Sequence, residues 1–334
     1  MRLLLPFYGL LTTLPLAVNA FKCSTSSDTI MTHNASSIER LQARSASAIK
    51  TRFAMPWPVV TNTKTKTRTR AVKYCYGDEY TRNLLDCKVQ AAFTMWAERL
   101  GYPAGPETGH SLSWDEADDK NEDPKKRKHE YCFLPGLDEN GEAVWSDKVA
   151  KDHLIIIESL GTSSWSTQVS SLILNSLINK NVVFGMVHEF TRNDRDEYVL
   201  YTCSNIKGYS DAVAKAKAAE PTLSDDHIHD SLCNNKDFAV KYSFLGSQYV
   251  KNQDGRVGDD SPKFDVDSIM MYSSWGFAND EDACDKDKMK CPLLKYPPPE
   301  YQFGDVKIPE MIEDPESPSA GDIAWLKQYY PPEH

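Results

Sequence analysis

The sequence predicts a protein of the α+β class, because segments with the spacing of strands and segments with the spacing of helices follow one another along the chain. Residues 71–76 alternate as an edge strand does, and residues 154–157 form a short apolar run that is typical of a buried strand. Residues 80–100 carry an apolar stripe at helical spacing. With 334 residues, the chain has room for one large domain behind a leading segment, or for two ordinary domains.

The composition and net charge of the chain argue against some classes of binding partner. Hydrophobic residues make up 40% of the chain, as in a folded protein, and the formal net charge is -10. Neutralising the phosphates of a nucleic acid takes clustered Lys and Arg, and the one short cluster is Lys64, Lys66, Arg68 and Arg70. After the first twenty residues, no stretch reaches the ~18 apolar residues that a membrane-spanning helix needs. We expect no nucleic-acid or membrane partner, and the oligomeric state stays open.

The first twenty residues have the features of a secretory signal. Arg2 supplies the positive start, residues 3–18 are mostly apolar, and Val18-Asn19-Ala20 is a small-x-small cleavage site. All eight cysteines follow this segment, and an even number in an oxidising compartment predicts disulfides. Cys284 and Cys291 are placed to close a small loop, while the other pairings stay open. The sequence therefore predicts a signal peptide over residues 1–20 and a secreted, extracellular protein.

Residues 21–56 are predicted to be a pro-segment ahead of the main domain. They are rich in Ser, Thr and Ala, and Ser36 and Glu39 have the spacing of a capping box at the start of a helix. Two interpretations stay open, namely a loosely held N-terminal helix and an inhibitory propeptide that lies over a cleft. The main domain, residues 57–334, begins at Trp57-Pro58.

The remaining elements follow from local patterns. In the helix over residues 80–100, Gly101 supplies the stop. Residues 116–130 form a charged, solvated loop, a second helix covers about residues 170–184, and residues 276–316 read as irregular. Ser319 caps a last helix over residues 320–329, which buries Ile323, Trp325 or Leu326, and Tyr329. The stripe of the first helix consists of Leu85, Val89, Ala92, Phe93, Trp96 and Leu100.

An acidic stretch between residues 225 and 230 contains an H-x-H pair. His227 and His229 are flanked by Asp225, Asp226 and Asp230. Such a group has the residue types for loose metal binding, but a solvated acidic loop is the favoured interpretation.

Two short segments carry the strongest functional signal. The first, residues 185–199, reads GMVHEFTRNDRDEYV, and the second, residues 267–272, reads DSIMMY. In this order, and about eighty residues apart, they resemble the astacin family of secreted zinc endopeptidases, a group of metzincins. The family pattern is HExxHxxGxxHExxRxDRDxY followed by a Met-turn of the form SxMxY. The resemblance covers roughly residues 57–330.

The resemblance implies a particular version of the α+β fold. It is an astacin-like metzincin domain, with a twisted mixed sheet and long helices in an N-terminal lobe. A mostly irregular C-terminal lobe, held by disulfides, ends in a helix. The cleft between the lobes would run along an edge strand, where an extended peptide adds by main-chain hydrogen bonds. A peptide or protein is therefore the expected partner.

The chain departs from the family pattern at the zinc ligands. When Gly185 and His188 are aligned with the pattern, the first two His ligands fall on Ile178 and Val182 and the catalytic Glu falls on Asn179. His188 is the only ligand retained. Ile and Val offer no lone pair, whereas zinc takes three protein ligands and an open position, and Asn cannot act as a carboxylate base. Zinc is predicted to be absent or weakly bound, so the chain is expected to be an inactive pseudoprotease that binds peptides or proteins.

The retained residues have roles implied by the resemblance. Tyr272 matches the tyrosine that reaches the metal and steadies the developing oxyanion; without metal we expect a packing residue with a hydrogen-bonded hydroxyl. Met270 packs beneath the site in either case. Gly185, Glu189 and Arg192 are expected to be structural, and His188 to be a partly buried histidine with its hydrogen bonds satisfied.

An active zinc endopeptidase is the alternative. Residues 168–182 contain no Gly, although the family has a Gly-containing segment there, and the match resumes abruptly at Val183 or Gly185. A mispredicted exon boundary or a retained intron would produce this pattern. Proteolysis would then be restored by a message that encodes HExxH, or by other ligands that complete the site.

Overall fold

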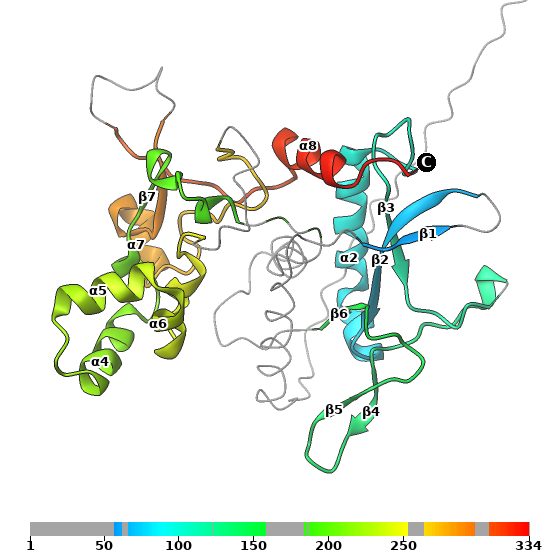
Figure 1. Cartoon of the computed structure of the whole chain (residues 1–334), viewed down its shortest axis with the longest axis horizontal. Helices are drawn as coiled ribbons and strands as arrows, with labels where there is room; N and C mark the ends of the chain where they lie inside the picture. The colour runs from blue at the N-terminus through cyan, green and yellow to red at the C-terminus, as the bar shows by residue number, and fades with distance from the viewer. Residues whose placement is uncertain are drawn as a thin grey trace, which may run out of the picture. The chain divides into compact units, whose positions relative to one another are not determined.

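The computed structural model describes residues 57–61, 66–121, 123–157, 184, 186, 188–252, 264–297 and 307–333 (Figure 1). All of them belong to the unit His33–His334. The fold contains a four-stranded mixed sheet and several helices, so the predicted α+β class is confirmed. The predicted signal peptide, the pro-segment and almost all of the second helix lie outside the described residues.

The main sheet is built around one strand. Its members are β1 (Val59–Thr61), β2 (Arg68–Tyr76), β3 (Leu112–Glu116) and β6 (Leu154–Ile156). β1 pairs with β2 in the antiparallel sense, while β3 and β6 pair with it in parallel. Arg70 is paired with both Val59 and Leu112, so β1 and β3 lie on opposite sides of β2. The predicted edge strand over residues 71–76 is therefore wrong, because this segment is central.

Helix α2 (Glu79–Leu100) packs against this sheet, and its ends are set by local chemistry. Oδ1 of Asp78 accepts a hydrogen bond of 2.7 Å from the backbone N–H of Thr81 and so caps the first turn. Gly101 ends the helix with φ at 93°, in the left-handed region that favours glycine. The predicted stripe is confirmed, because Val89, Ala92, Phe93, Trp96 and Leu100 are buried and Leu85 is partly buried.

Two further pairs of strands and four more helices lie in the described parts of residues 133–295. The strands are β4 (Phe133–Leu137) with β5 (Ala143–Trp145), and β7 (Val199–Tyr201) with β8 (Leu293–Lys295). The helices are α4 (Tyr209–Ala219), α5 (Asp225–Asn234), α6 (Lys236–Lys241) and α7 (Glu281–Lys286). Short 3₁₀ helices include η3 (Glu189–Thr191), η4 (Arg195–Glu197), η5 (Cys203–Asn205) and η6 (Leu245–Gln248). The prediction of a mostly irregular C-terminal part is wrong over residues 209–241, which are largely helical.

The last helix, α8 (Ala320–Tyr329), forms where the sequence predicts it. Ser319 and Asp322 make a reciprocal capping box, in which each side chain accepts from the other residue's backbone N–H. Leu326 is fully buried, and Ile323, Trp325 and Tyr329 pack more loosely against the same cluster. Among the described residues, none of the helices has the length and apolar character needed to cross a bilayer.

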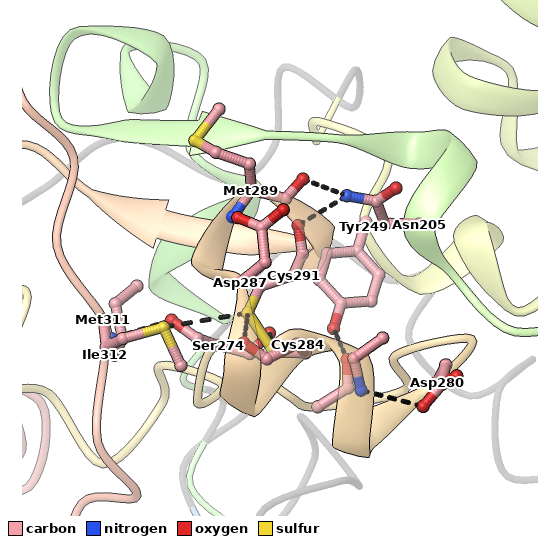
Figure 2. The surroundings of a disulfide bond; sticks show 12 residues. Asn205, Tyr249, Ser274, Asp280, Cys284, Asp287, Met289, Cys291, Met311 and Ile312 are labelled. Carbon is pink, nitrogen blue, oxygen red and sulfur yellow. Dashed lines mark hydrogen bonds between the residues drawn. A yellow bond between two sulfur atoms is a disulfide. The ribbon is translucent and has the colours of Figure 1, made fainter.

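Disulfides connect distant parts of the chain. Cys75 bonds to Cys132 and Cys203 to Cys233, and the predicted small loop between Cys284 and Cys291 is confirmed. Cys87 is disulfide-bonded as well. Figure 2 shows that the amide of Asn205 reaches the backbone carbonyls beside the small loop, at 2.9 Å from the oxygen of Met289 and 3.0 Å from that of Cys291. This side chain ties η5 to the loop.

A buried histidine after α2 predicts a dependence of stability on pH. His110 is 3% exposed; its Nε2 lies 2.9 Å from the carbonyl oxygen of Gly101, and its Nδ1 accepts from the backbone N–H of Leu112 at 3.2 Å. Burial lowers the pKa of His110 below its usual 6.5. The unfolded chain therefore binds the proton first as the pH falls through 6.5, and stability is lost on acidification.

Replacing His110 by Gln should make the fall in stability between pH 7 and pH 5.5 shallower. The expected difference is up to about 1.4 kcal/mol per pH unit, the limit for one proton. Urea unfolding of both proteins at the two pH values measures it. Equal slopes for the two proteins would contradict the buried, neutral state of His110.

Candidate functional site

His188 is the residue around which the candidate site is built. It precedes η3 and is 5% exposed. Its Nδ1 lies 3.1 Å from the carbonyl oxygen of Met270, which can only accept, so Nδ1 carries the proton and Nε2 keeps its lone pair. Nε2 faces the hydroxyl of Tyr272 at 3.5 Å. One ring nitrogen is therefore fixed by the backbone, and the other faces a phenol.

Two aromatic rings enclose this imidazole. Phe190 stacks on His188 with the ring centroids 5.0 Å apart, and Tyr272 lies at 4.7 Å in a tilted orientation. Burial lowers the pKa of His188 to about 4, against a small opposing effect of the Met270 carbonyl. The imidazole is thus neutral near pH 7.

The segment predicted to form a Met-turn contacts His188 through the Met270 carbonyl. Oγ of Ser268 accepts from the backbone N–H of Met270 at 3.0 Å, and the carbonyl of Ser268 accepts from Met271 at 2.9 Å, which closes a tight turn. Ile269 and Met270 are buried in one hydrophobic cluster, while Met271 and Tyr272 are buried in another. Packing in two hydrophobic clusters therefore fixes the turn, and the Met270 carbonyl is held against the imidazole of His188.

The hydroxyl of Tyr272 has a second partner that the sequence does not predict. It donates a hydrogen bond of 3.0 Å to Oε1 of Gln248, in η6. Tyr272 is itself buried, and burial raises its pKa well above the usual value. The site thus contains a neutral imidazole, a neutral phenol and an amide. No motif in the sequence marks Gln248, which lies between the two predicted segments.

Glu189 and Arg192 connect the site to its surroundings. Oε1 of Glu189 accepts from the backbone N–H of Asp265 at 2.9 Å and from Nη1 of Arg192 at 3.3 Å. The guanidinium of Arg192 also makes a forked pair with Asp194, at 2.9 and 2.8 Å. Burial raises the pKa of Glu189 to about 7 in spite of these donors. Glu189 therefore holds the backbone at Asp265, and Arg192 lies between the carboxylates of Glu189 and Asp194.

Several predicted site residues lie outside the described part of the chain. They are Ile178, Asn179, Val182 and Gly185. The structure brings His188 and Glu189 into contact with Met270 and Tyr272, although about eighty residues separate the two pairs in the sequence. Within the described ranges, no group of three His, Cys, Asp or Glu side chains is arranged to hold a metal ion. Of the three predicted ligand positions, His188 alone lies in the described part of the chain, and its ring packs against a phenol and a phenyl ring.

The H-x-H pair lies on a helix rather than in the predicted loop, so that prediction is wrong. α5 begins after Ser224, whose Oγ accepts from the backbone N–H of His227 at 3.2 Å. Residues two apart on a helix point in different directions, so His227 and His229 do not converge on one ion. His229 instead contacts the hydroxyl of Tyr209 through Nδ1.

Comparisons with known proteins give a distant structural likeness. No known family and no curated protein matches the chain. Among solved structures, the chain is similar to high choriolytic enzyme 1 (HCE-1), a hatching enzyme zinc-protease from Oryzias latipes (medaka fish). The TM-score is 0.39 and the identity 14%, over 82% of this chain and 93% of that one. A likeness at this TM-score does not establish a family.

Proposed function

We propose that the chain is a secreted, astacin-like protein with a broken zinc site, a pseudoprotease that binds peptides or proteins and does not hydrolyse them. The observation that carries the proposal is chemical. In the alignment fixed by Gly185 and His188, aliphatic side chains stand at two of the three ligand positions. An aliphatic carbon has no lone pair to give to a metal, so two of three first-shell bonds are missing.

The loss of the general base supports the same conclusion. Asn179 stands where the pattern has Glu, and an amide does not take a proton from water near pH 7. A positioned general base contributes about 10²–10⁴-fold to a rate, and a water without its metal keeps a pKa near 15.7. Together these losses remove the chemistry of an astacin-type hydrolase.

The surroundings of His188 agree with a site that is used for packing. Its imidazole is 5% exposed and lies against Phe190 and Tyr272. The Tyr272 hydroxyl is bound to Gln248, so the groups nearest the imidazole are bonded to protein partners. The disulfides support the secreted location, because such bonds persist in oxidising compartments.

A restoration experiment tests the proposal. The triple variant Ile178→His, Asn179→Glu, Val182→His should bind zinc at least ~100-fold more tightly than the natural chain, since even outer-shell changes alter metal affinity by about 10–100-fold. Competition against a chromogenic zinc chelator measures the affinity. The control is the same variant with His188→Ala, which should lose most of the gain. Equal affinities of the natural chain and the triple variant would contradict the alignment.

One observation favours the enzyme as a second candidate. Metal-binding histidines donate their other N–H to a carbonyl or carboxylate, and His188 has this arrangement through Met270. If the expressed message encodes HExxH in place of residues 178–182, His188 is already in the tautomer that a zinc ligand needs. Sequencing the message across codons 160–185 decides between the two candidates.

A further inference from the structure

A cavity of about 490 Å³ lies beside β7, and its lining does not include His188, Met270 or Tyr272. This β7 cavity is lined by η4, β7, η5 and α5, together with Lys251 and Tyr296. Its volume falls within the ~300–1,000 Å³ of small-molecule sites. The side chains that matter for a ligand are Arg195, Asp196, Tyr201 and Lys251, which all line it.

Arg195 presents unused donors at this wall. Its side chain is 2% exposed, and its Nη1 donates to the carbonyl oxygens of Phe190, at 3.0 Å, and Tyr249. Nε lies 3.3 Å from Oδ1 of Asp196. Nη2 makes no hydrogen bond to any residue in the described ranges. A guanidinium has five N–H donors in a fixed fork, so two of them stay available on a side chain that is locked in position.

The charged groups of the wall do not cancel. Arg195 and Lys251 are cations, and Asp196 is the one carboxylate among the residues described as lining the cavity, so two positive and one negative charge leave +1. Asp196 is shared, because Oδ1 faces Arg195 and Oδ2 accepts from Nζ of Lys251. A single carboxylate between two cations leaves the wall positive, although the whole chain is acidic at -10.

Tyr201 adds a second unused donor. Its hydroxyl is buried and has no hydrogen-bond partner within the described part of the chain. The ring cannot turn away easily, because Tyr249 stacks on it at 5.5 Å and the Arg195 guanidinium lies over it at 4.4 Å. A buried hydroxyl without an acceptor costs about 1–3 kcal/mol, so an acceptor placed beside it would be favourable.

We propose that the β7 cavity binds a small oxyanion, the carboxylate or phosphate group of a small molecule. The oxyanion accepts from Nη2 of Arg195 and from the Tyr201 hydroxyl, and Lys251 contributes positive charge. A cation would be repelled by the wall, and an apolar ligand would leave the donors unpaired. This inference does not depend on the state of the zinc-motif positions.

Calorimetric titration of the full chain tests the inference. Inorganic phosphate and citrate are the two probes, at constant ionic strength set with NaCl, because salt alone screens exposed charges. Saturable binding of phosphate identifies the phosphate class, and saturable binding of citrate identifies the carboxylate class; either result supports the inference. No saturable binding of either anion up to about 20 mM, well beyond the millimolar affinity that ~4 kcal/mol represents, would overturn it.

Variants tie the binding to the β7 cavity. Tyr201→Phe removes the unpartnered hydroxyl, breaks no bond that the described residues make, and should weaken binding by roughly tenfold, as expected for a hydrogen bond to a charged group. Lys251→Met should weaken it about threefold. The matched control is Lys241→Met, which removes a lysine bound to Glu220 outside the cavity and should change nothing. Equal affinity of the Tyr201→Phe variant and the natural chain would place the anion elsewhere and overturn the inference.

Discussion

Replacing Asp322 by Ala should lower the free energy of unfolding by about 3–5 kcal/mol, because several buried hydrogen-bond donors lose their acceptor. Asp322 is 3% exposed. Its carboxylate accepts from Oγ of Ser268 at 2.6 Å, from the backbone N–H of Ile269 at 2.8 Å and from that of Ser319 at 2.9 Å. These bonds join the start of α8 to the turn at residues 268–271, so their loss loosens the backbone that contacts His188.

Urea unfolding measures this loss of stability, and two further variants with smaller expected losses serve as comparisons. Asp322→Asn keeps one carbonyl oxygen and should cost about half as much as Asp322→Ala. Asp280→Ala removes an exposed cap, in which Oδ1 accepts from the backbone N–H of Ala283 at 2.9 Å, and should cost only about 1 kcal/mol. A loss near 1 kcal/mol for Asp322→Ala would show that the turn is held by packing alone.

Removing the disulfide between Cys75 and Cys132 should cost about 4 kcal/mol. The bond closes a loop with a sequence separation of 57, and in the chain-entropy description the stabilisation rises with the length of the loop. Both cysteines are fully buried, and the bond connects β2 to the segment just before β4. The double variant Cys75→Ala, Cys132→Ala tests this.

Two disulfides with shorter loops are matched controls. Cys203–Cys233 has a separation of 30 and should contribute about 3.5 kcal/mol, whereas Cys284–Cys291 has a separation of 7 and should contribute about 2.5 kcal/mol. Double Cys→Ala variants of each, compared by urea unfolding at one pH, give the order. Equal losses for the longest and shortest loops would mean that local packing outweighs chain entropy.

The helices at the two ends of the described chain could be predicted because local signals agree there. α2 has a continuous apolar stripe and a Gly stop, and α8 has a Ser cap. α5 was missed, although Ser224 caps it and Ile228 and Leu232 have helical spacing. The dense acids suggested a loop, but Asp225 and Asp226 lie in the first turn, where negative charge stabilises a helix.

The position of a strand in a sheet was harder to predict than the strand itself. Lys73 gave residues 71–76 the alternation of an edge strand. In the structure Lys73 pairs with Asp152 at 3.0 Å, while Ala71, Val72, Tyr74, Cys75 and Tyr76 are all buried. A single lysine, paired with a carboxylate, therefore gives a central strand the sequence pattern of an edge strand.

The candidate site could be predicted only where a motif exists. His188, Met270 and Tyr272 were singled out from two segments, and their contacts join those segments. Gln248 and the enclosing stack of Phe190 were not predicted, because tertiary packing places them and no local pattern marks them. The β7 cavity likewise depends on residues drawn from six parts of the chain.

The zinc content of the purified natural protein tests the central claim most directly. The protein is equilibrated with a modest excess of zinc, passed through a desalting column and measured by inductively coupled plasma mass spectrometry. With aliphatic side chains at two ligand positions, we predict well under ~0.1 zinc per chain. One zinc per chain, accompanied by cleavage of casein that a chelator abolishes, would contradict the proposal and identify a working endopeptidase.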